Sequence, residues 1–158
     1  MDPFIAALRD PACYPHPVQA VEVLETHISW VLLAGAYAYK VKKPVRLPFL
    51  DFSTLGARHR YCEEELRLNR RTAPRIYLDV VPIVQTARGP AIALAGNLPA
   101  PAVPLDYAVK MRRFADGALA ETLARRGALG PAQIDAIALT VAQFHASLPC
   151  AVAADAFG

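Results

Sequence analysis

Cysteine is scarce in this sequence of 158 residues, and a long apolar run is missing altogether. The three cysteines (Cys13, Cys62 and Cys150) are odd in number and widely spaced, which fits neither a disulfide framework nor a metal-ligand motif. No stretch reaches the roughly eighteen consecutive apolar residues of a membrane-spanning helix. The first residues also lack the basic-then-apolar pattern of a secretory signal. We therefore expect a cytoplasmic protein with no membrane partner and no metal site.

The sequence has little excess charge of either sign. Its formal net charge is +3, which is too small to require a nucleic-acid partner. The arginines between Arg67 and Arg75 form a basic cluster, but cations are common near the C-terminal end of a helix. Aromatic residues are sparse around them, whereas single-stranded nucleic acids are bound by interleaved basic and aromatic side chains. We therefore expect no nucleic-acid partner.

Apolar residues make up 54% of the chain, enough for one domain with a hydrophobic core. Strand patterns come first and helical patterns follow, an order typical of an α+β fold. A break at Gly35-Ala36 predicts a hairpin, and Ser53 or Thr54 is the expected cap of a long helix reaching about Arg71. The segment from Pro44 to Phe52 is expected to be irregular. Strands are expected at residues 21–25, 30–33, 76–84, 91–95 and 107–111, with a further strand through Lys40 and two helices after residue 118.

Two lysines interrupt the second apolar strand of the predicted hairpin, the strand that follows the turn at Gly35-Ala36. Because side chains alternate along a strand, Lys40 and Lys42 should lie on one face and Lys43 on the other. An ammonium on an inward face needs an anionic partner or ligand, since burying it alone is costly. The long helix offers carboxylates, and helical spacing allows either Glu64 or Glu65 to lie on its buried face. A strand lysine paired with a helix glutamate is the arrangement with which protein kinases hold ATP phosphates.

The turn before this hairpin carries two hydroxyls and a histidine, at Thr26, His27 and Ser29. Such a turn could direct hydroxyls and backbone N–H groups towards a phosphate. It could equally be an ordinary polar turn, and the residues alone leave both interpretations open.

Several longer motifs resemble one bacterial family, the aminoglycoside phosphotransferase-like kinases, which are often fused to a P-loop ATPase domain. The resemblance extends from about Tyr14 to the end of the chain. Its motifs are Glu25-Thr-His-Ile-Ser-Trp, Ala38-Tyr-Lys-Val-Lys-Lys-Pro-Val, Phe49-Leu-Asp-Phe-Ser-Thr-Leu, Glu63-Glu-Glu-Leu-Arg-Leu-Asn-Arg-Arg and Val109-Lys-Met-Arg-Arg-Phe.

The resemblance implies a protein-kinase-like small lobe that binds ATP, with magnesium in the complete enzyme. Lys40 resembles the strand lysine that reaches the α- and β-phosphates, and Lys42 is the alternative because it shares that strand face. Glu65 or Glu64 resembles the helix partner. By the same resemblance, Thr26, His27 and Ser29 belong to a nucleotide-positioning loop, and Met111, Arg112 and Arg113 to a hinge whose backbone would bind the adenine edge.

The same resemblance implies a domain order, and it shows which catalytic and metal-binding motifs of such kinases this sequence does not contain. Residues 1–111 would form the small lobe, 112–117 the connector and 118–158 the first helices of a large lobe. No His-Gly-Asp, His-Arg-Asp or Asp-Phe-Gly sequence is present to supply a catalytic base or metal-binding aspartate, so we assign no catalytic residue. We expect the front portion of a longer kinase, inactive alone, whose phosphate acceptor the sequence does not reveal.

The alternative interpretation is a non-catalytic binding or regulatory module that uses the lobe as an interaction surface. An incomplete large lobe would leave the apolar helix faces around Ile134–Phe144 uncovered. Uncovered apolar faces favour self-association or a partner protein.

Overall fold

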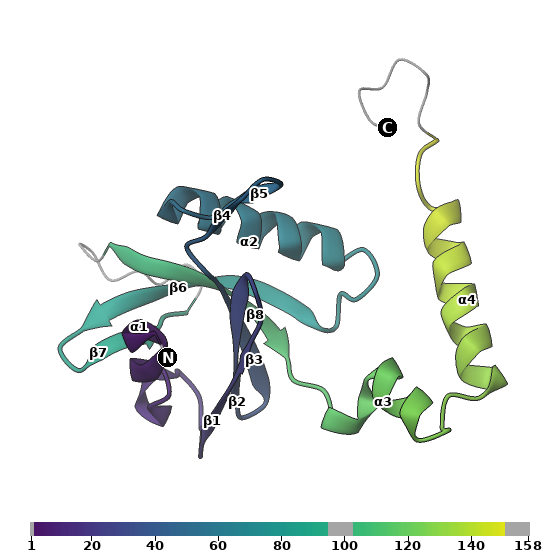
Figure 1. Cartoon of the computed structure of the whole chain (residues 1–158), viewed down its shortest axis with the longest axis horizontal. Coiled ribbons are helices and arrows are strands. Elements are labelled where there is room, and N and C mark those ends of the chain that lie inside the picture. Colours follow the sequence, from purple (N-terminus) through teal and green to yellow (C-terminus); the bar gives the residue numbers. More distant parts are fainter. Residues whose placement is uncertain (1, 95–102, 151–158) are drawn as a thin grey trace. The chain divides into compact units, whose positions relative to one another are not determined.

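The computed structural model describes residues 2–94 and 103–150, which fall into two compact units. The first unit, Met1–Arg113, contains the sheet, and the second, Phe114–Gly158, contains helices (Figure 1). The expected α+β class is confirmed. Within the described ranges, no helix is long and apolar enough to cross a membrane.

The first unit is built on a curled antiparallel sheet of six strands in the order β1-β2-β3-β8-β6-β7. The strand β3 lies between β2 and β8, so its backbone is hydrogen-bonded on both sides. The strands are β1 (Val21–Glu25), β2 (Ser29–Ala34), β3 (Tyr37–Lys42), β6 (Tyr77–Thr86), β7 (Gly89–Ile92) and β8 (Pro104–Arg112).

The predicted hairpin between β2 and β3 is present and turns at Gly35. This residue adopts a φ of +57°, a left-handed conformation that glycine takes without steric cost. A Cβ at this position would also lie 2.9 Å from the carbonyl oxygen of Pro17. The turn therefore requires glycine for two separate reasons.

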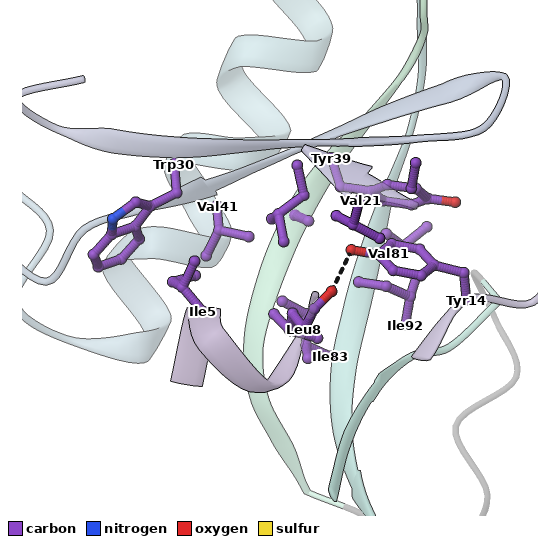
Figure 2. Close-up of a cluster of buried hydrophobic side chains, with 13 residues drawn as sticks. Ile5, Leu8, Tyr14, Val21, Trp30, Tyr39, Val41, Val81, Ile83 and Ile92 are labelled. Atoms are coloured by element: carbon purple, nitrogen blue, oxygen red, sulfur yellow. Dashed lines mark hydrogen bonds between the residues drawn. The ribbon is translucent and has the colours of Figure 1, made fainter. Parts of the chain in front are cut away.

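One face of the sheet carries the hydrophobic core, which the N-terminal segment covers. The short helix α1 (Pro3–Ala7) is capped by Asp2, whose carboxylate accepts hydrogen bonds from the amides of Phe4 and Ile5. It places Ile5 and Leu8, both fully buried, against Trp30, Val41 and other strand residues (Figure 2). After the turn η1 (Pro11–Cys13), the Tyr14 hydroxyl donates to the Leu8 carbonyl at 2.8 Å.

The opposite face of the sheet carries the long helix α2 (Leu55–Asn69). Thr54 caps it, because its hydroxyl accepts a hydrogen bond from the Ala57 amide at 3.1 Å. Arg58 and Cys62 are buried and Glu65 is mostly buried, at the spacing of one helix face. Val41 of β3 points into the core and Lys40 towards α2, as strand alternation requires.

The segment before α2 differs from the expectation. Instead of being irregular, it forms a small hairpin of β4 (Arg46–Leu47) and β5 (Leu50–Asp51). Pro48-Phe49 makes the tight turn between these strands, a local feature that strand periodicity over two residues cannot reveal.

Other expected elements are present with shifted ends. Strand β8 runs from Pro104 to Arg112, so Arg112 belongs to the sheet rather than to the expected connector. In the second unit, the turn η2 (Asp116–Ala118) precedes α3 (Ala120–Arg125) and α4 (Pro131–Ala146). Of the strand expected at residues 91–95, residues 91 and 92 belong to β7, and residue 95 lies outside the described ranges. Residues 151–158, at the end of the helical segment expected at 118–158, also lie outside the described ranges.

Candidate functional site

Lys40, Lys42 and Glu65 meet between β3 and α2. The Lys40 Nζ donates to Glu65 Oε1 at 2.8 Å, and the Lys42 Nζ donates to Glu65 Oε2 at 2.6 Å. One carboxylate therefore binds both lysines that strand alternation predicted to share a face. The side chain of Lys40 is 29% exposed, whereas those of Lys42 and Glu65 are only 5% and 13% exposed. Of the three, Lys40 is the residue whose charge faces solvent.

Glu65 is held in its ionised form despite its burial. Burial alone raises the pKa of this carboxyl, but the hydrogen bonds and charges of Lys40 and Lys42 outweigh that effect and bring the pKa below its usual value. The cluster of two ammonium groups and one carboxylate therefore carries an excess positive charge at neutral pH. Such a cluster is suited to an anionic ligand.

Of the two glutamates left open by the sequence, Glu65 contacts Lys40. Glu64 points away and binds the Arg67 guanidinium at 2.8 Å on the exposed face of α2. Glu63 lies near His59, at 3.6 Å from its Nε2. Three adjacent glutamates are spread over the helix circumference, so only the orientation of α2 on the sheet selects the inward one.

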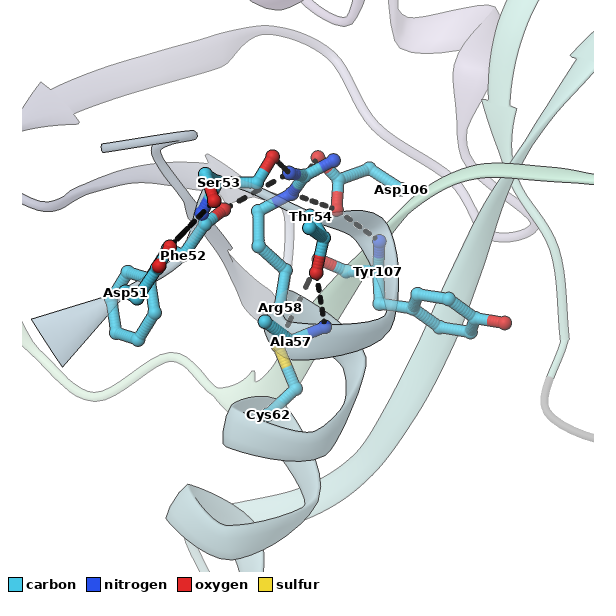
Figure 3. A network of polar contacts seen from close by, with 9 residues as sticks. All are labelled: Asp51, Phe52, Ser53, Thr54, Ala57, Arg58, Cys62, Asp106 and Tyr107. Atoms are coloured by element: carbon cyan, nitrogen blue, oxygen red, sulfur yellow. Dashed lines mark hydrogen bonds and ion pairs between the residues drawn. The ribbon is translucent and has the colours of Figure 1, made fainter. Parts of the chain in front are cut away.

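A buried ion pair that the sequence did not predict fixes the beginning of α2. The Arg58 Nε contacts both carboxylate oxygens of Asp106 on β8, at 3.0 and 2.9 Å (Figure 3). Its Nη1 donates to the carbonyl oxygens of Phe52 and Ser53 at 3.1 and 3.2 Å. The Tyr107 amide also donates to Asp106, at 2.8 Å. Burial nevertheless raises the pKa of Asp106 above its usual value, against the lowering effect of Arg58.

The end of α2 is attached to β6 by Arg70. Its guanidinium donates to the carbonyl oxygens of Tyr77, at 3.0 Å, and of Leu78. The arginine cluster of the sequence is thus partly structural, because this member joins α2 to the sheet. Together with Arg58 and Glu65, it attaches the helix to the sheet near its beginning, middle and end.

The turn between β1 and β2 is tightly closed on itself. The Thr26 hydroxyl accepts from the Ser29 amide and donates to the Ser29 carbonyl, both at 3.0 Å. His27 is exposed, and Ser29 is fully buried opposite Lys42 in the strand register. Among the described residues, the Ser29 hydroxyl is a buried polar group with no hydrogen-bond partner. The Thr26 hydroxyl thus serves the turn, and Ser29 is the residue next to the lysines.

The three residues expected in a hinge lie at the end of β8. Met111 pairs with Ala38 of β3 and is half-buried. The amide of Arg112 donates to the Ile76 carbonyl at 2.8 Å, and that of Arg113 to the Ala36 carbonyl at 2.9 Å. These two N–H groups are occupied within the fold, so an adenine edge would have to meet other atoms of this segment.

The described residues show no metal centre near this site. In residues 2–94 and 103–150, no three His, Cys, Asp or Glu side chains are placed to hold one ion. A shallow groove does lie between α2 and β6, but Lys40 and Lys42 are not among its lining residues, which include His59, Glu63, Arg67, Arg70 and Asp79.

Comparison with known proteins finds relatives but no assigned activity. Over 140 residues the chain is 34% identical to uncharacterized proteins of two strains of Mycobacterium tuberculosis and one of Mycobacterium bovis. The match covers 87% of this chain but 25% of each relative, so the chain spans about a quarter of their length. No protein-family model matches the chain, and no solved structure does.

Proposed function

We propose that this chain is the ATP-binding small lobe of a cytoplasmic phosphotransferase of the aminoglycoside phosphotransferase-like kinase type. The observation that carries the proposal is the ion pair between Lys40 on β3 and Glu65 on α2, with 2.8 Å between the bonded atoms. In protein kinases a lysine on the third strand and a glutamate on the following helix form the pair that orients the nucleotide phosphates. Here the lysine is likewise on the third strand, and α2 is the first long helix after it.

The sheet face beside Lys40 supports the same proposal. Ala38 lies two residues before the lysine, the spacing of the Val-Ala-Ile-Lys motif in protein kinases. The pairing register places Val31 opposite Lys40 and Leu24 opposite Val31, on the same face. Met111 lies opposite Ala38 on that face, and Leu24 is 46% exposed. An apolar surface next to one exposed ammonium suits a flat base with a phosphate tail.

Binding of the nucleotide and transfer of its phosphoryl group place different demands on the residues. Transfer needs metal ions and a group that orients the nucleophile. The described residues do not fit a magnesium site, because the Glu65 carboxylate is already bonded to both lysines and no other carboxylates gather there. The proposed role of this chain is therefore to bind the nucleotide, and catalysis would belong to other parts of a longer protein.

Calorimetric titration with ATP and magnesium tests the proposal. We expect saturable binding to the unmodified chain and a loss of about tenfold to a hundredfold in Lys40→Ala, because a charge-assisted hydrogen bond contributes about 1.5–3 kcal/mol. Lys43→Ala is the matched control, since Lys43 directly follows β3 and binds Glu25 instead of Glu65. Equal affinity of the chain and Lys40→Ala would contradict the proposal, as would the absence of any binding by a folded chain.

A second candidate function, partner binding without catalysis, is favoured by α4. Apolar residues occur on all sides of this helix, and such helices are normally buried. Four of them are between 45% and 59% exposed in the described structure: Ile134, Ile137, Leu139 and Val141.

The partner-binding candidate predicts association of the chain with itself when no other partner is present. Sedimentation velocity should show a concentration-dependent increase in mass, and Ile137→Asp should reduce it because the new charge would have to be desolvated in the contact. Glu121→Gln, at an exposed position of α3, is the control. A chain that stays monomeric over a wide concentration range would contradict self-association through α4.

A further inference from the structure

Lys42 cannot act as a direct ligand of a phosphate in this structure. Its side chain is only 5% exposed, and its Nζ is bonded to Glu65 Oε2 at 2.6 Å. The same ammonium lies 5.0 Å from the centre of the Phe52 ring, within the range of a cation–π contact. The lysine is therefore enclosed between α2, β3 and Phe52, and it must act through Glu65.

We propose that Lys42 is a charge-setting and positioning residue: it neutralises Glu65 from the buried side, so that the exposed Lys40 keeps a full excess positive charge for a polyphosphate. This inference rests on the proposed nucleotide site and identifies the ligand group that the site selects. That group is a chain of phosphates, with the base contributing separately.

The charge count of the cluster explains why a second lysine matters. One lysine and one glutamate form a neutral pair, which attracts an anion only weakly. Two lysines sharing one carboxylate have a net charge of +1, and the ion pairs Arg58–Asp106 and Arg67–Glu64, which also involve residues of α2, are each neutral. Because Lys42 and Glu65 are buried, water screens them poorly, and the uncompensated charge acts at Lys40.

Lys42 also fixes the direction of the Glu65 carboxylate. One oxygen, Oε2, is taken by Lys42, which leaves Oε1 for Lys40. Without Lys42, both oxygens would be available to Lys40, and the ammonium would be drawn towards the helix and away from solvent. The loss of charge and the loss of orientation both weaken phosphate binding.

Three variants separate these effects from simple loss of structure. Lys42→Met keeps the length of the buried side chain and leaves Glu65 paired with Lys40, so the fold should persist while the cluster becomes neutral. Lys43→Met removes the same charge from the next residue, whose partner is Glu25 outside the site. The double variant Lys42→Met/Glu65→Gln removes both buried charges and restores the net charge of +1 through Lys40 alone.

The probes are inorganic tripolyphosphate and ATP, titrated by calorimetry at low salt, with thermal unfolding of each variant as a check on the fold. We expect Lys42→Met to weaken tripolyphosphate binding about tenfold or more, because one charge is lost close to the ligand. Lys43→Met should bind within about twofold of the unmodified chain, since the charge of Lys43 is paired with Glu25 away from the site. The double variant should recover most of the lost affinity, which a merely structural role of Lys42 would not allow.

The outcomes distinguish this inference from the proposed function. Undiminished tripolyphosphate binding in folded Lys42→Met overturns the inference, and so does a folded double variant that recovers nothing. If tripolyphosphate follows the expected pattern while ATP shows no saturable binding, the inference stands and the nucleotide proposal fails. A folded, unmodified chain that binds neither probe overturns both.

Discussion

Replacing Arg58 by alanine is expected to lower the free energy of unfolding of the first unit by about 3–5 kcal/mol, the usual cost of removing one partner from a buried ion pair. Arg58 and Asp106 have side chains that are each 10% exposed. The variant would leave the Asp106 carboxylate buried with only the Tyr107 amide as a donor among the contacts described above. It would also deprive the Phe52 and Ser53 carbonyls of their donor. Urea unfolding followed by circular dichroism measures the loss.

The size of this effect is large relative to the stability of a domain. Natural domains are stable by about 5–15 kcal/mol, so a loss of 3–5 kcal/mol removes a large share of the total. Arg67→Ala is the matched control, because this arginine is on the same helix but its ion pair with Glu64 is exposed. The melting temperature of the Arg67→Ala variant should be nearly unchanged.

A further variant separates the energy of the ion pair from the cost of leaving one charge alone. Replacing both Arg58 and Asp106 by apolar residues of similar volume should restore much of the stability, because buried ion pairs contribute little beyond their own desolvation. If Arg58→Ala alone were as stable as the unmodified chain, the pair would not be the attachment of α2 that its burial indicates.

Residue order alone was sufficient to predict the face shared by Lys40 and Lys42. Period-two alternation follows from strand geometry, so identifying the strand also identified the lysine face, and the opposite orientation of Lys43 is confirmed by its contact with Glu25. The need of these lysines for a carboxylate followed from the cost of burying a charge. Both arguments use only local geometry and elementary electrostatics.

Contacts between distant segments were not predictable in the same way. Arg58 and Asp106 are 48 residues apart in the sequence. The residues adjacent to each of them do not identify the other as its partner. Asp106 lies between Leu105 and Tyr107, just before the strand expected at residues 107–111, and these neighbours do not identify Arg58 as its partner. The choice of Glu65 over Glu64 likewise depends on how α2 is rotated about its axis, which the tertiary contacts determine.

The attachments of α2 bear on how the site works. In protein kinases the strand lysine and helix glutamate must both be in place, and the position of the helix controls this. Here the helix is attached to the sheet through Arg58, Glu65 and Arg70, and the Lys40–Glu65 pair is one of these attachments. If the chain binds a nucleotide as proposed, we therefore expect that binding to require no movement of α2.

Glu65→Gln is expected to be the most damaging change within the site itself, because it leaves the buried Lys42 ammonium without a carboxylate. Removing one partner of a buried ion pair costs about 3–5 kcal/mol at neutral pH. The neutral amide oxygen can accept one hydrogen bond, so the cost should lie towards the lower end of that range. Urea unfolding at pH 7 measures it, with Glu63→Gln as the control because Glu63 is on the same helix and 59% exposed.

The acid dependence of stability provides a separate signature of Glu65. Although burial raises the pKa of Glu65, the two lysines lower it below its usual value, so the carboxylate is more acidic in the folded than in the unfolded chain. Its stabilising contribution is therefore complete above about pH 4.3, the usual glutamate pKa, and is lost as the pH falls through the lower folded value. The pKa of Asp106 is shifted upwards, so its protonation favours the folded state as the pH falls and cannot produce this loss. Unfolding measured from pH 3 to pH 7 should show a smaller acid-induced decrease in Glu65→Gln than in the unmodified chain, and an unchanged decrease would mean that Glu65 does not bind the two lysines as charged partners in solution.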